Sequence, residues 1–244
     1  MREKLVSLIT GASKGIGKAI AKRFLKRGLH VIGSYARDDE AADETRKEFF
    51  AFGEKFLLVR ADFSAFAGID IVETAVAAAG GRLHFLVSNV GITDRVDFQD
   101  TTPDNWERVI RTNLTIPFFL VQRAAKWIPD ETGRIVFIGA TMGLQPHSIS
   151  YSYAASKAAL HFLAKCLVKE FSPKGITVNV VAPGFVDTPM QSEKDPEHRK
   201  RIEHRIAVGR FARPDEVAAV VEGLLDHRYV TGQVIAVDGG YDCR

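Results

Sequence analysis

Short runs of β-branched and other apolar residues alternate along the chain with longer segments in which apolar positions recur at helical spacing. A run that is apolar at successive positions is typical of a strand covered on both faces of a sheet. The alternation of such strands with helices predicts an α/β protein with a parallel sheet, right-handed crossovers and helices on both faces. We expect seven strands, near residues 4–10, 29–34, 55–61, 83–88, 133–139, 176–182 and 233–237.

Helices are expected between these strands, and one of them should be kinked. The clearest helical patterns cover residues 18–27, 38–52, 103–127 and 151–171. Because Pro117 has no N–H group, the carbonyl of Asn113, four residues earlier, cannot receive its usual helical hydrogen bond. We therefore expect a kink that leaves this carbonyl free for a water molecule or a side chain.

No linker, repeat or low-complexity segment divides the sequence, which predicts one domain over residues 1–244. The polar segment Gln191–Arg205 is expected to be a mobile loop. With its flanks, over residues 185–210, it is predicted to form a lid on a substrate. In a parallel sheet of this kind, ligands bind beyond the carboxyl ends of the strands.

A glycine-rich turn connects the first strand to the first helix. Residues 10–17 read TGASKGIG and follow the apolar run that ends at Ile9. Backbone N–H groups at such a turn and the dipole of the following helix attract a phosphate, while the glycines let it approach closely. The spacing G-x-x-x-G-x-G differs from the longer-known G-x-G-x-x-G fingerprint but uses the same physics. It predicts a Rossmann-type, doubly wound sheet with a dinucleotide site.

The end of the second strand favours one dinucleotide over the other. Tyr35-Ala36-Arg37 stands where an aspartate or glutamate would bind the ribose 2′-hydroxyl of NAD. Arg37, together with Lys14 in the glycine-rich turn, places cations where a 2′-phosphate would lie. The sequence therefore favours NADP(H).

Tyr153 and Lys157 are four residues apart on the helix predicted over 151–171, so their side chains share one face of that helix. A nearby cation favours the phenolate and should lower the pKa of the tyrosine from about 10 towards neutral pH. The pair therefore predicts an acid catalyst that acts on a bound molecule.

The composition of the chain argues against several classes of partner and of site. A chain of 244 residues with 46% hydrophobic content is ample for one α/β domain with a large core. The formal charge of +3 is spread along the chain without basic blocks, which argues against nucleic acid as a partner. Cys166 and Cys243 form neither a disulfide framework nor a metal motif, and no apolar run is long enough for a membrane helix. We expect a cytoplasmic protein with no metal site and no membrane partner.

Taken in order, these motifs resemble the short-chain dehydrogenase/reductase family over essentially the whole chain, and most of all its β-ketoacyl-[acyl-carrier-protein] reductase branch. Besides the glycine-rich turn and the Tyr153/Lys157 pair, the resemblance rests on six segments. They are Ala61–Ser64 (ADFS), Ser88–Gly91 (SNVG), Arg111–Leu114 (RTNL), Pro183–Thr188 (PGFVDT), Thr231–Gln233 (TGQ) and Val237–Gly240 (VDGG).

The resemblance implies an NADP-dependent enzyme that transfers a hydride from the cofactor to a carbonyl carbon. It implies that Tyr153 protonates the developing alkoxide, that Lys157 holds the nicotinamide ribose, and that Asn113 supports a proton-relay water. The substrates it implies are 3-oxoacyl thioesters linked to acyl carrier protein or CoA, in fatty acid or polyketide biosynthesis. The residues expected to bind the cofactor are Gly11, Ser13, Lys14, Gly15, Ile16, Gly17, Tyr35, Arg37, Asp62, Phe63, Asn89, Gly91, Tyr153, Lys157, Pro183, Gly184, Val186 and Thr188.

Ala140 departs from the family pattern. The segment Gly139–Gly143 aligns without gaps to one in which a serine at this position hydrogen-bonds the substrate oxygen. Losing one such donor typically costs a hundred- to thousandfold in rate, or about 3–4 kcal/mol.

Three explanations of this gap remain open. Thr141 can serve as the catalytic donor from the next position if the chain bulges there, since adjacent strand residues point to opposite faces. A water or a residue of the preceding loop can supply the bond, with His147, Ser148 and Ser150 as the candidates. The third explanation is a substrate that needs no such donor, as in pteridine-reducing relatives.

The sequence is therefore compatible with three functions. The first is a 3-oxoacyl thioester reductase, and the second is a reductase of another carbonyl or of a pteridine-like substrate. The third is a cofactor-binding but catalytically weak subunit that stabilises an active partner in a hetero-oligomer. The resemblance also implies a homotetramer or dimer that pairs the helices at 103–127 and 151–171.

Overall fold

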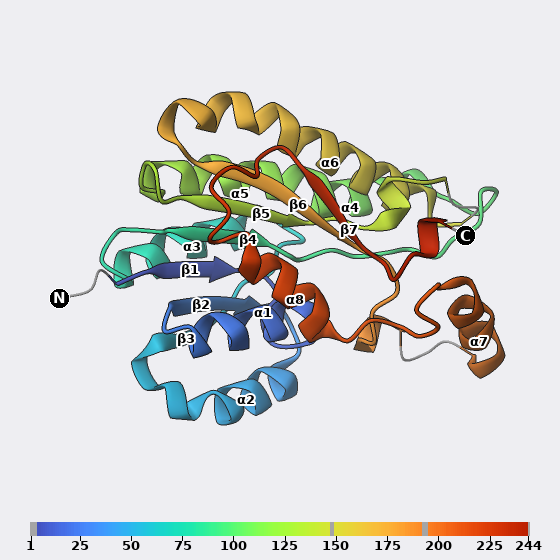
Figure 1. The fold of residues 1–244 in the computed structure, drawn as a ribbon, viewed down its shortest axis with the longest axis horizontal. Helices are drawn as coiled ribbons and strands as arrows, with labels where there is room; N and C mark the ends of the chain where they lie inside the picture. Colours follow the sequence, from blue (N-terminus) through green and yellow to red (C-terminus); the bar gives the residue numbers. More distant parts are fainter. Residues whose placement is uncertain (1–3, 147–148, 192–194, 244) are drawn as a thin grey trace.

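Seven parallel strands form one sheet in the order β3-β2-β1-β4-β5-β6-β7 in the computed structural model, which describes residues 4–146, 149–191 and 195–243 (Figure 1). Each predicted strand is present within two residues of its expected bounds, and the doubly wound parallel sheet is confirmed. The strands are β1 (Val6–Ile9), β2 (His30–Tyr35), β3 (Phe56–Arg60), β4 (Phe85–Ser88), β5 (Arg134–Ile138), β6 (Thr177–Pro183) and β7 (Val234–Val237).

Helices cover both faces of the sheet, with α3, α4, α5 and α6 on one face and α1, α2 and α8 on the other (Figure 1). Neighbouring residues of a strand enter different cores: Phe137 packs with α3, α5 and α6, whereas Val136 and Ile138 pack with α1 and α8. The strands are apolar at successive positions for this reason. The helices are α1 (Gly15–Lys26), α2 (Asp39–Glu48), α3 (Ala67–Ala78), α4 (Pro103–Ile110), α5 (Ile116–Ala124), α6 (Tyr151–Phe171) and α8 (Pro214–Gly223).

The strand order reverses beside β1, which pairs with β2 on one side and β4 on the other. The loops that follow β1 and β4 therefore leave the sheet in opposite directions and open a crevice at its carboxyl edge. Thr10 begins one of these loops and Asn89 the other. The reversal thus brings two of the predicted binding segments to one place.

The predicted helix over 103–127 is interrupted, as expected, but the interruption has a specific form. A five-residue turn of π-helix, Arg111–Thr115, separates α4 from α5, and the N–H of Ile116 bonds the carbonyl of Arg111. The widened turn contains Asn113 and precedes Pro117 rather than centring on it. Turns of this kind occur frequently at functional sites.

The segment predicted as a mobile loop over 191–205 contains a helix, so the expectation of a loop is wrong for residues 196–205. Helix α7 spans Pro196–Arg205, and the Asp195 carboxylate accepts a hydrogen bond from the His198 N–H at its start. An N-cap aspartate followed by proline is a helix-start signal that the sequence contains. Ile202 of α7 is buried in a small apolar cluster with Ile206 and Phe211.

Within the described ranges, no helix is long and apolar enough to cross a membrane. The same part of the chain contains no group of three or more histidine, cysteine or acidic side chains placed to hold a metal ion. Cys166 and Cys243 are both exposed and unpaired.

We predict that Phe137→Ala lowers the free energy of unfolding by about 3–5 kcal/mol, because it opens a cavity in the core between the sheet and α3, α5 and α6. Phe50→Ala is the matched control, since this side chain is 84% exposed, and it should change stability by less than about 0.5 kcal/mol. Chemical denaturation of both variants measures the difference. Equal effects would contradict the placement of Phe137 in the core.

Candidate active site

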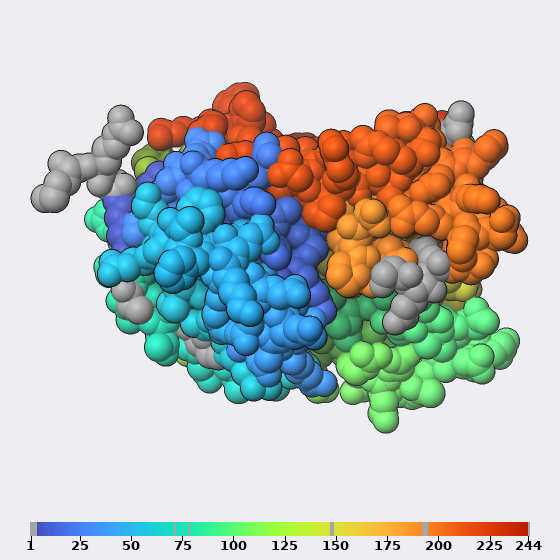
Figure 2. All heavy atoms as spheres, turned by 90° about the horizontal axis from the view of Figure 1, so that it is seen from below, coloured from blue at the N-terminus to red at the C-terminus, as the bar shows by residue number. Residues whose placement is uncertain are grey.

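A cavity of about 1100 Å³ lies at the carboxyl edge of the sheet. It runs from the glycine-rich turn and the ends of β2 and β3, past the end of β4, to the N-terminal part of α6 and the segment after β6. Figure 2 shows the furrow between the N-terminal part of the chain and the segments that follow β4 and β6. Of the predicted site residues, Gly17 and Asn113 are not on the cavity wall, and the others are.

The glycine-rich turn has the geometry of an anion cradle. Gly11 and Gly15 adopt φ values of +68° and +58°, which L side chains rarely adopt. A Cβ at Gly17 would lie 2.0 Å from the Gly11 carbonyl oxygen, so only glycine fits at that position. The N-cap of α1, Lys14, makes no side-chain cap, and the first turn of the helix has no acidic residue. The first N–H groups of α1 can therefore bind an anion.

Asn89 fastens this turn to β4. Its side-chain NH₂ donates to the carbonyls of Thr10 (2.8 Å) and Gly11 (3.1 Å), and its backbone N–H donates to the Thr10 hydroxyl (2.8 Å). The N–H of Val90 donates to the same hydroxyl at 3.0 Å. The side chain of Asn89 thus positions the loop, and it also forms part of the cavity wall.

The two cations predicted to receive a 2′-phosphate are each paired with a carboxylate at the cavity rim. Lys14 Nζ lies 2.6 Å from Asp38 Oδ2, and Arg37 Nη2 lies 3.0 Å from Asp62 Oδ2. The pKa of Asp38 is lowered chiefly by the hydrogen bond from Lys14. The pKa of Asp62 is lowered first by its hydrogen bonds from Ser64 and then by Arg37. Both pairs are exposed and exchangeable, so a phosphate can compete for the cations.

Tyr35, Phe63 and Ser13 border the same end of the cavity but have further structural contacts. Tyr35 is buried, and its ring lies under the guanidinium of Arg46 at 5.2 Å. Phe63 is part of the core on the α3 side of the sheet. The carbonyl of Ser13 accepts a hydrogen bond from the hydroxyl of Thr45 at 2.8 Å.

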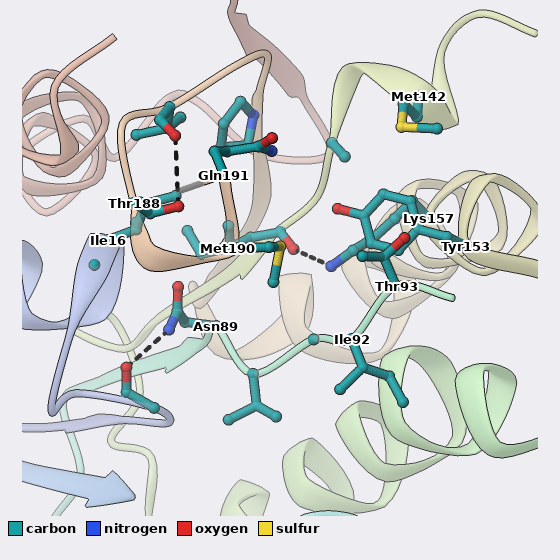
Figure 3. Close-up of a pocket in the computed structure, with 18 of the residues that line it drawn as sticks. Ile16, Asn89, Ile92, Thr93, Met142, Tyr153, Lys157, Thr188, Met190 and Gln191 are labelled. Carbon is teal, nitrogen blue, oxygen red and sulfur yellow. Dashed lines mark hydrogen bonds between the residues drawn. The ribbon is translucent and has the colours of Figure 1, made fainter. Parts of the chain in front are cut away.

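Tyr153 and Lys157 both point from α6 into the far end of the cavity (Figure 3). Lys157 Nζ donates to the Ile138 carbonyl at 2.8 Å and lies 5.7 Å from the centre of the Tyr153 ring. Burial lowers the pKa of Lys157 to about 8 and raises that of Tyr153 to about 12. Burial thus shifts the pKa of Tyr153 upward, opposite to the direction expected from the charge of Lys157.

Asn113 is buried beneath this pair and braces it. Its Oδ1 accepts from the Ile92 N–H (2.9 Å), and its Nδ2 donates to the Ile92 carbonyl (2.9 Å) and to the Ser156 hydroxyl (3.0 Å). The side chain therefore links the loop after β4 to α6. Gly91 makes room for the brace, since a Cβ there would lie 3.2 Å from Lys157 Nζ and 3.4 Å from Asn113 Oδ1. The sequence motif identified Asn113 but gave no sign of its partner Ser156 as a brace.

The chain changes direction at the position of the absent serine. Ala140 is extended, with φ −164°, and the next three residues, Thr141–Gly143, form a 3₁₀ turn. Ala140 and Thr141 are both buried and both line the cavity. The objection that adjacent strand residues face opposite ways therefore does not apply, because Thr141 lies beyond the end of β5 in a tight turn.

Ser150, His147 and Ser148 were the other residues expected to supply the donor. Ser150 accepts hydrogen bonds from the Arg95 N–H (3.0 Å) and the Thr93 hydroxyl (3.3 Å), and it has a φ of +61°. Its hydroxyl is therefore engaged in holding the loop after β4. His147 and Ser148 lie outside the described residues.

The segment after β6 closes the cavity on its last side. The N–H of Gly184 bonds the Val237 carbonyl at 3.0 Å, and a Cβ on Gly184 would lie 2.8 Å from that of Asp238. The hydroxyl of Thr188 donates to the Val186 carbonyl at 3.4 Å. These contacts hold the predicted segment 183–188 against β7, with Pro183, Gly184, Val186 and Thr188 all on the cavity wall.

His161 is a buried titratable residue that the sequence analysis overlooked. It lies one turn beyond Lys157 on α6, and its Nε2 accepts from the Ala140 N–H at 3.4 Å. Gly139 and Gly143 leave space for the ring, since a Cβ at either would lie within 3.0 Å of it. Burial, and then the charge of Lys157, lower the pKa of His161 to about 4. The spacing Tyr153, Lys157, His161, four residues apart each time, was the signal available.

A parallel sheet with a glycine-rich turn at its switch point and a tyrosine–lysine pair in the same cavity defines an α/β, dinucleotide-dependent oxidoreductase. The family model described as enoyl-(acyl carrier protein) reductase matches residues 11–242. The chain belongs to the short-chain dehydrogenase/reductase family, and the family predicted from the motifs is confirmed.

Known relatives cover almost the whole chain. The 3β-hydroxysteroid dehydrogenase 1 of Eggerthella lenta is 36% identical over 239 residues, which are 96% of this chain and 92% of that protein. A dehydrogenase/reductase from Sinorhizobium meliloti 1021 is 33% identical with a TM-score of 0.91, covering 98% of this chain and 95% of that one. A short-chain dehydrogenase from Burkholderia cenocepacia J2315, solved in complex with NADP, is 32% identical with a TM-score of 0.91 and 98% coverage of both chains. These relatives do not single out the β-ketoacyl reductase branch.

We predict that His161 makes stability depend on pH. Its pKa is about 4 in the folded chain and 6.5 when exposed, so the unfolded chain binds a proton that the folded chain does not. The stabilisation is fully present above about pH 6.5 and is lost as the pH falls to 4, at a cost of roughly 3 kcal/mol. In His161→Gln this component should be absent, whereas His227→Gln, an exposed control, should keep it. Denaturant unfolding at pH 7 and pH 4 tests this, and parallel pH dependences for both variants would refute it.

Proposed function

We propose that the protein is an NADPH-dependent reductase of a carbonyl group, with Tyr153 as the general acid. The observation that carries the proposal is that one cavity joins the glycine-rich turn to the Tyr153/Lys157 pair. A dinucleotide has the length to span those two ends, and when bound NADPH supplies the hydride. The substrate we favour is a 3-oxoacyl thioester, carried on acyl carrier protein or CoA.

The preference for NADPH is supported by the charges at the end of β2. No carboxylate occupies the positions directly after Tyr35, and Lys14 and Arg37 stand at the rim. A 2′-phosphate carries more charge than a single carboxylate and offers several acceptor oxygens, so it can take over from Asp38 and Asp62 as the partner of these cations. The NADP bound to the Burkholderia cenocepacia relative agrees with this choice.

The reaction needs a proton donor, a positive charge beside that donor, and contacts that keep the donor aligned. Tyr153, whose pKa is raised to about 12, holds its proton at neutral pH and can donate it to the alkoxide that forms. Lys157, with a pKa lowered to about 8, is still largely protonated at pH 7 and offsets the charge left on the phenolate. Asn113 and Ser156 hold the loop after β4 against α6, and so keep the tyrosine aligned.

Thr141 is proposed to replace the missing serine as the donor to the substrate oxygen. Two features support it. Thr141 lies on the cavity wall. It also belongs to a 3₁₀ turn beyond the end of β5, so the alternation of side chains along a strand does not direct it away from the cavity. No hydrogen bond of its hydroxyl to another described residue competes for this role. A donor at this place is worth about 3–4 kcal/mol to the transition state.

A second substrate class deserves a parallel test because of the steroid dehydrogenase relative at 36% identity. Ile92, Met142, Ile149 and Met190 give the cavity an apolar wall near Tyr153, which suits a hydrophobic ketone as well as an acyl chain. A homotetramer or dimer built on α4, α5 and α6 is part of the proposal, and the exposed ring of Phe162 on α6 supports it.

We predict that Tyr153→Phe lowers kcat at least a hundredfold, because the general acid is lost, while the affinity for NADPH stays unchanged. The measurement is NADPH oxidation with an acetoacetyl thioester, a steroid ketone and a dihydropterin, alongside fluorescence titration of NADPH. Unchanged turnover in the variant would refute the assignment. Tight NADPH binding without turnover on any substrate would instead support the catalytically weak subunit of a hetero-oligomer.

We predict that Thr141→Val lowers kcat a hundred- to thousandfold, since the isosteric valine removes only the donor. Thr141→Ser keeps the hydroxyl and should retain activity. In the double variant Ala140→Ser with Thr141→Val, a donor returns at the usual family position and should recover much of the loss. If Thr141→Val is as active as the natural chain, the donor is elsewhere and this assignment is wrong.

A further inference from the structure

Three arginines, Arg95, Arg108 and Arg205, border the cavity at the end that holds Tyr153, away from the glycine-rich turn. They come from three different elements: the loop after β4, helix α4 and helix α7. Within the described residues, none of the three forms an ion pair with a carboxylate. Arg199 and Arg210, which are close in sequence to Arg205, are both paired, with Asp187 and Glu216. These three arginines are therefore available to an anionic ligand.

Arg95 is held in place by a strained and specific local structure. It has a φ of +49°, a value rare for a residue with a side chain, and the surroundings must stabilise it. Its N–H donates to the Ser150 hydroxyl at 3.0 Å, and the neighbouring Asp94 accepts a hydrogen bond from Ser152. Ser150 also has a positive φ, and its N–H bonds the Val96 carbonyl at 3.4 Å. Two strained positions thus fix where the Arg95 side chain begins.

The guanidinium of Arg95 reaches across to the opposite wall of the cavity. Its Nη2 donates to the main-chain carbonyl of Met190, in the segment after β6. A neutral carbonyl is a weaker partner for a guanidinium than a carboxylate or phosphate, which can accept two parallel hydrogen bonds. A ligand with such a group can therefore displace the Met190 carbonyl.

The partners of the two other arginines among the described residues are also weak. Arg108 donates to the side-chain oxygen of Asn105 on the same helix. The guanidinium of Arg205 lies over the ring of Tyr241, 4.8 Å from its centre. Among the described residues that line this end of the cavity, the carboxylate is Asp242, and burial and then Asp238 raise its pKa. Three guanidinium groups thus border this end of the cavity beside one carboxylate among its described lining residues.

We propose that Arg95 is a specificity-determining residue that binds an anionic group of the carbonyl substrate, with Arg108 and Arg205 adding to the attraction. The substrate is thus a ketone that carries a phosphate or a carboxylate away from its reacting carbon. This inference rests on the proposed carbonyl reductase function and adds the chemical class of the substrate. Arg95 binds the anionic group of the substrate, while Tyr153 donates its proton to the oxygen of the reacting carbonyl.

The experiment compares three acetoacetyl-type substrates that share the reacting group. The first is the neutral N-acetylcysteamine thioester, the second is the CoA thioester with its phosphates, and the third is the N-acetylcysteamine thioester with a carboxylate at the end of the acyl chain. Arg95→Gln should lower kcat/KM for a charged substrate about 10- to 100-fold and leave the neutral one unchanged. The charged substrate that responds shows whether phosphate or carboxylate is recognised.

Arg201→Gln is the matched control, because Arg201 is an exposed arginine of α7 that does not border the cavity. It should leave kcat/KM for all three substrates unchanged. If Arg95→Gln does not fold, Arg205→Gln and the ionic-strength dependence of the natural enzyme give the same information. Salt should raise KM for the charged substrates only.

Two outcomes overturn the proposal. Equal losses for neutral and charged substrates in Arg95→Gln would show that Arg95 only connects the loops through Met190. Equal kcat/KM for neutral and charged substrates in the natural enzyme, without salt dependence, would show that no anion is recognised. If no thioester is reduced but another ketone is, the substrate of the proposed function is wrong, and the comparison is made with that ketone and its carboxylated analogue.

Discussion

The hydrogen bonds between Thr10 and Asn89 hold together the two loops that diverge at the switch point of the sheet. One hydroxyl accepts two backbone N–H groups, and one amide satisfies two carbonyls, all across the boundary between β1 and β4. Without these bonds, buried loop carbonyls would lack partners and the glycine-rich turn would have no fixed position relative to β4. The distance between the anion cradle and Tyr153 depends on this connection, because the loop after β4 continues to Ile92 and its brace.

The same loop explains how the reacting end is kept rigid. Ile92 is bonded on both sides by the amide of Asn113, and that amide also reaches Ser156 on α6. The π-helical turn places Asn113 where all three bonds form, at the expense of a regular helix. Burial then sets the protonation states, because Tyr153 keeps its proton and His161 stays neutral. Alignment and desolvation thus come from one connected set of contacts.

The sequence predicted the sheet and most of the cavity wall because these depend on local signals. Apolar runs define the strands, and Gly11, Gly15 and Tyr153 belong to motifs of short span. The features it missed depend on contacts between distant segments. His161 fits under Ala140 only because two glycines leave space, and Arg95 reaches Met190 only because Ser150 supports an unusual backbone angle. Helix α7 is different, since its Asp195-Pro196 start was visible in the sequence but was outweighed by the polar composition.

The missing donor at Ala140 and the arginines at the Tyr153 end of the cavity both affect how well the transition state is stabilised. A donor at the carbonyl oxygen stabilises the transition state directly, whereas a contact remote from the reacting atoms can hold the carbonyl in the reactive position. An anionic group bound by Arg95 would fix the substrate at a second point and reduce its freedom beside Tyr153. Such anchoring would offset the loss of the donor that the family usually has at the position of Ala140. A family member without the usual serine can therefore remain an efficient enzyme for a substrate that carries its own anchor, and a poor one for the same ketone without it.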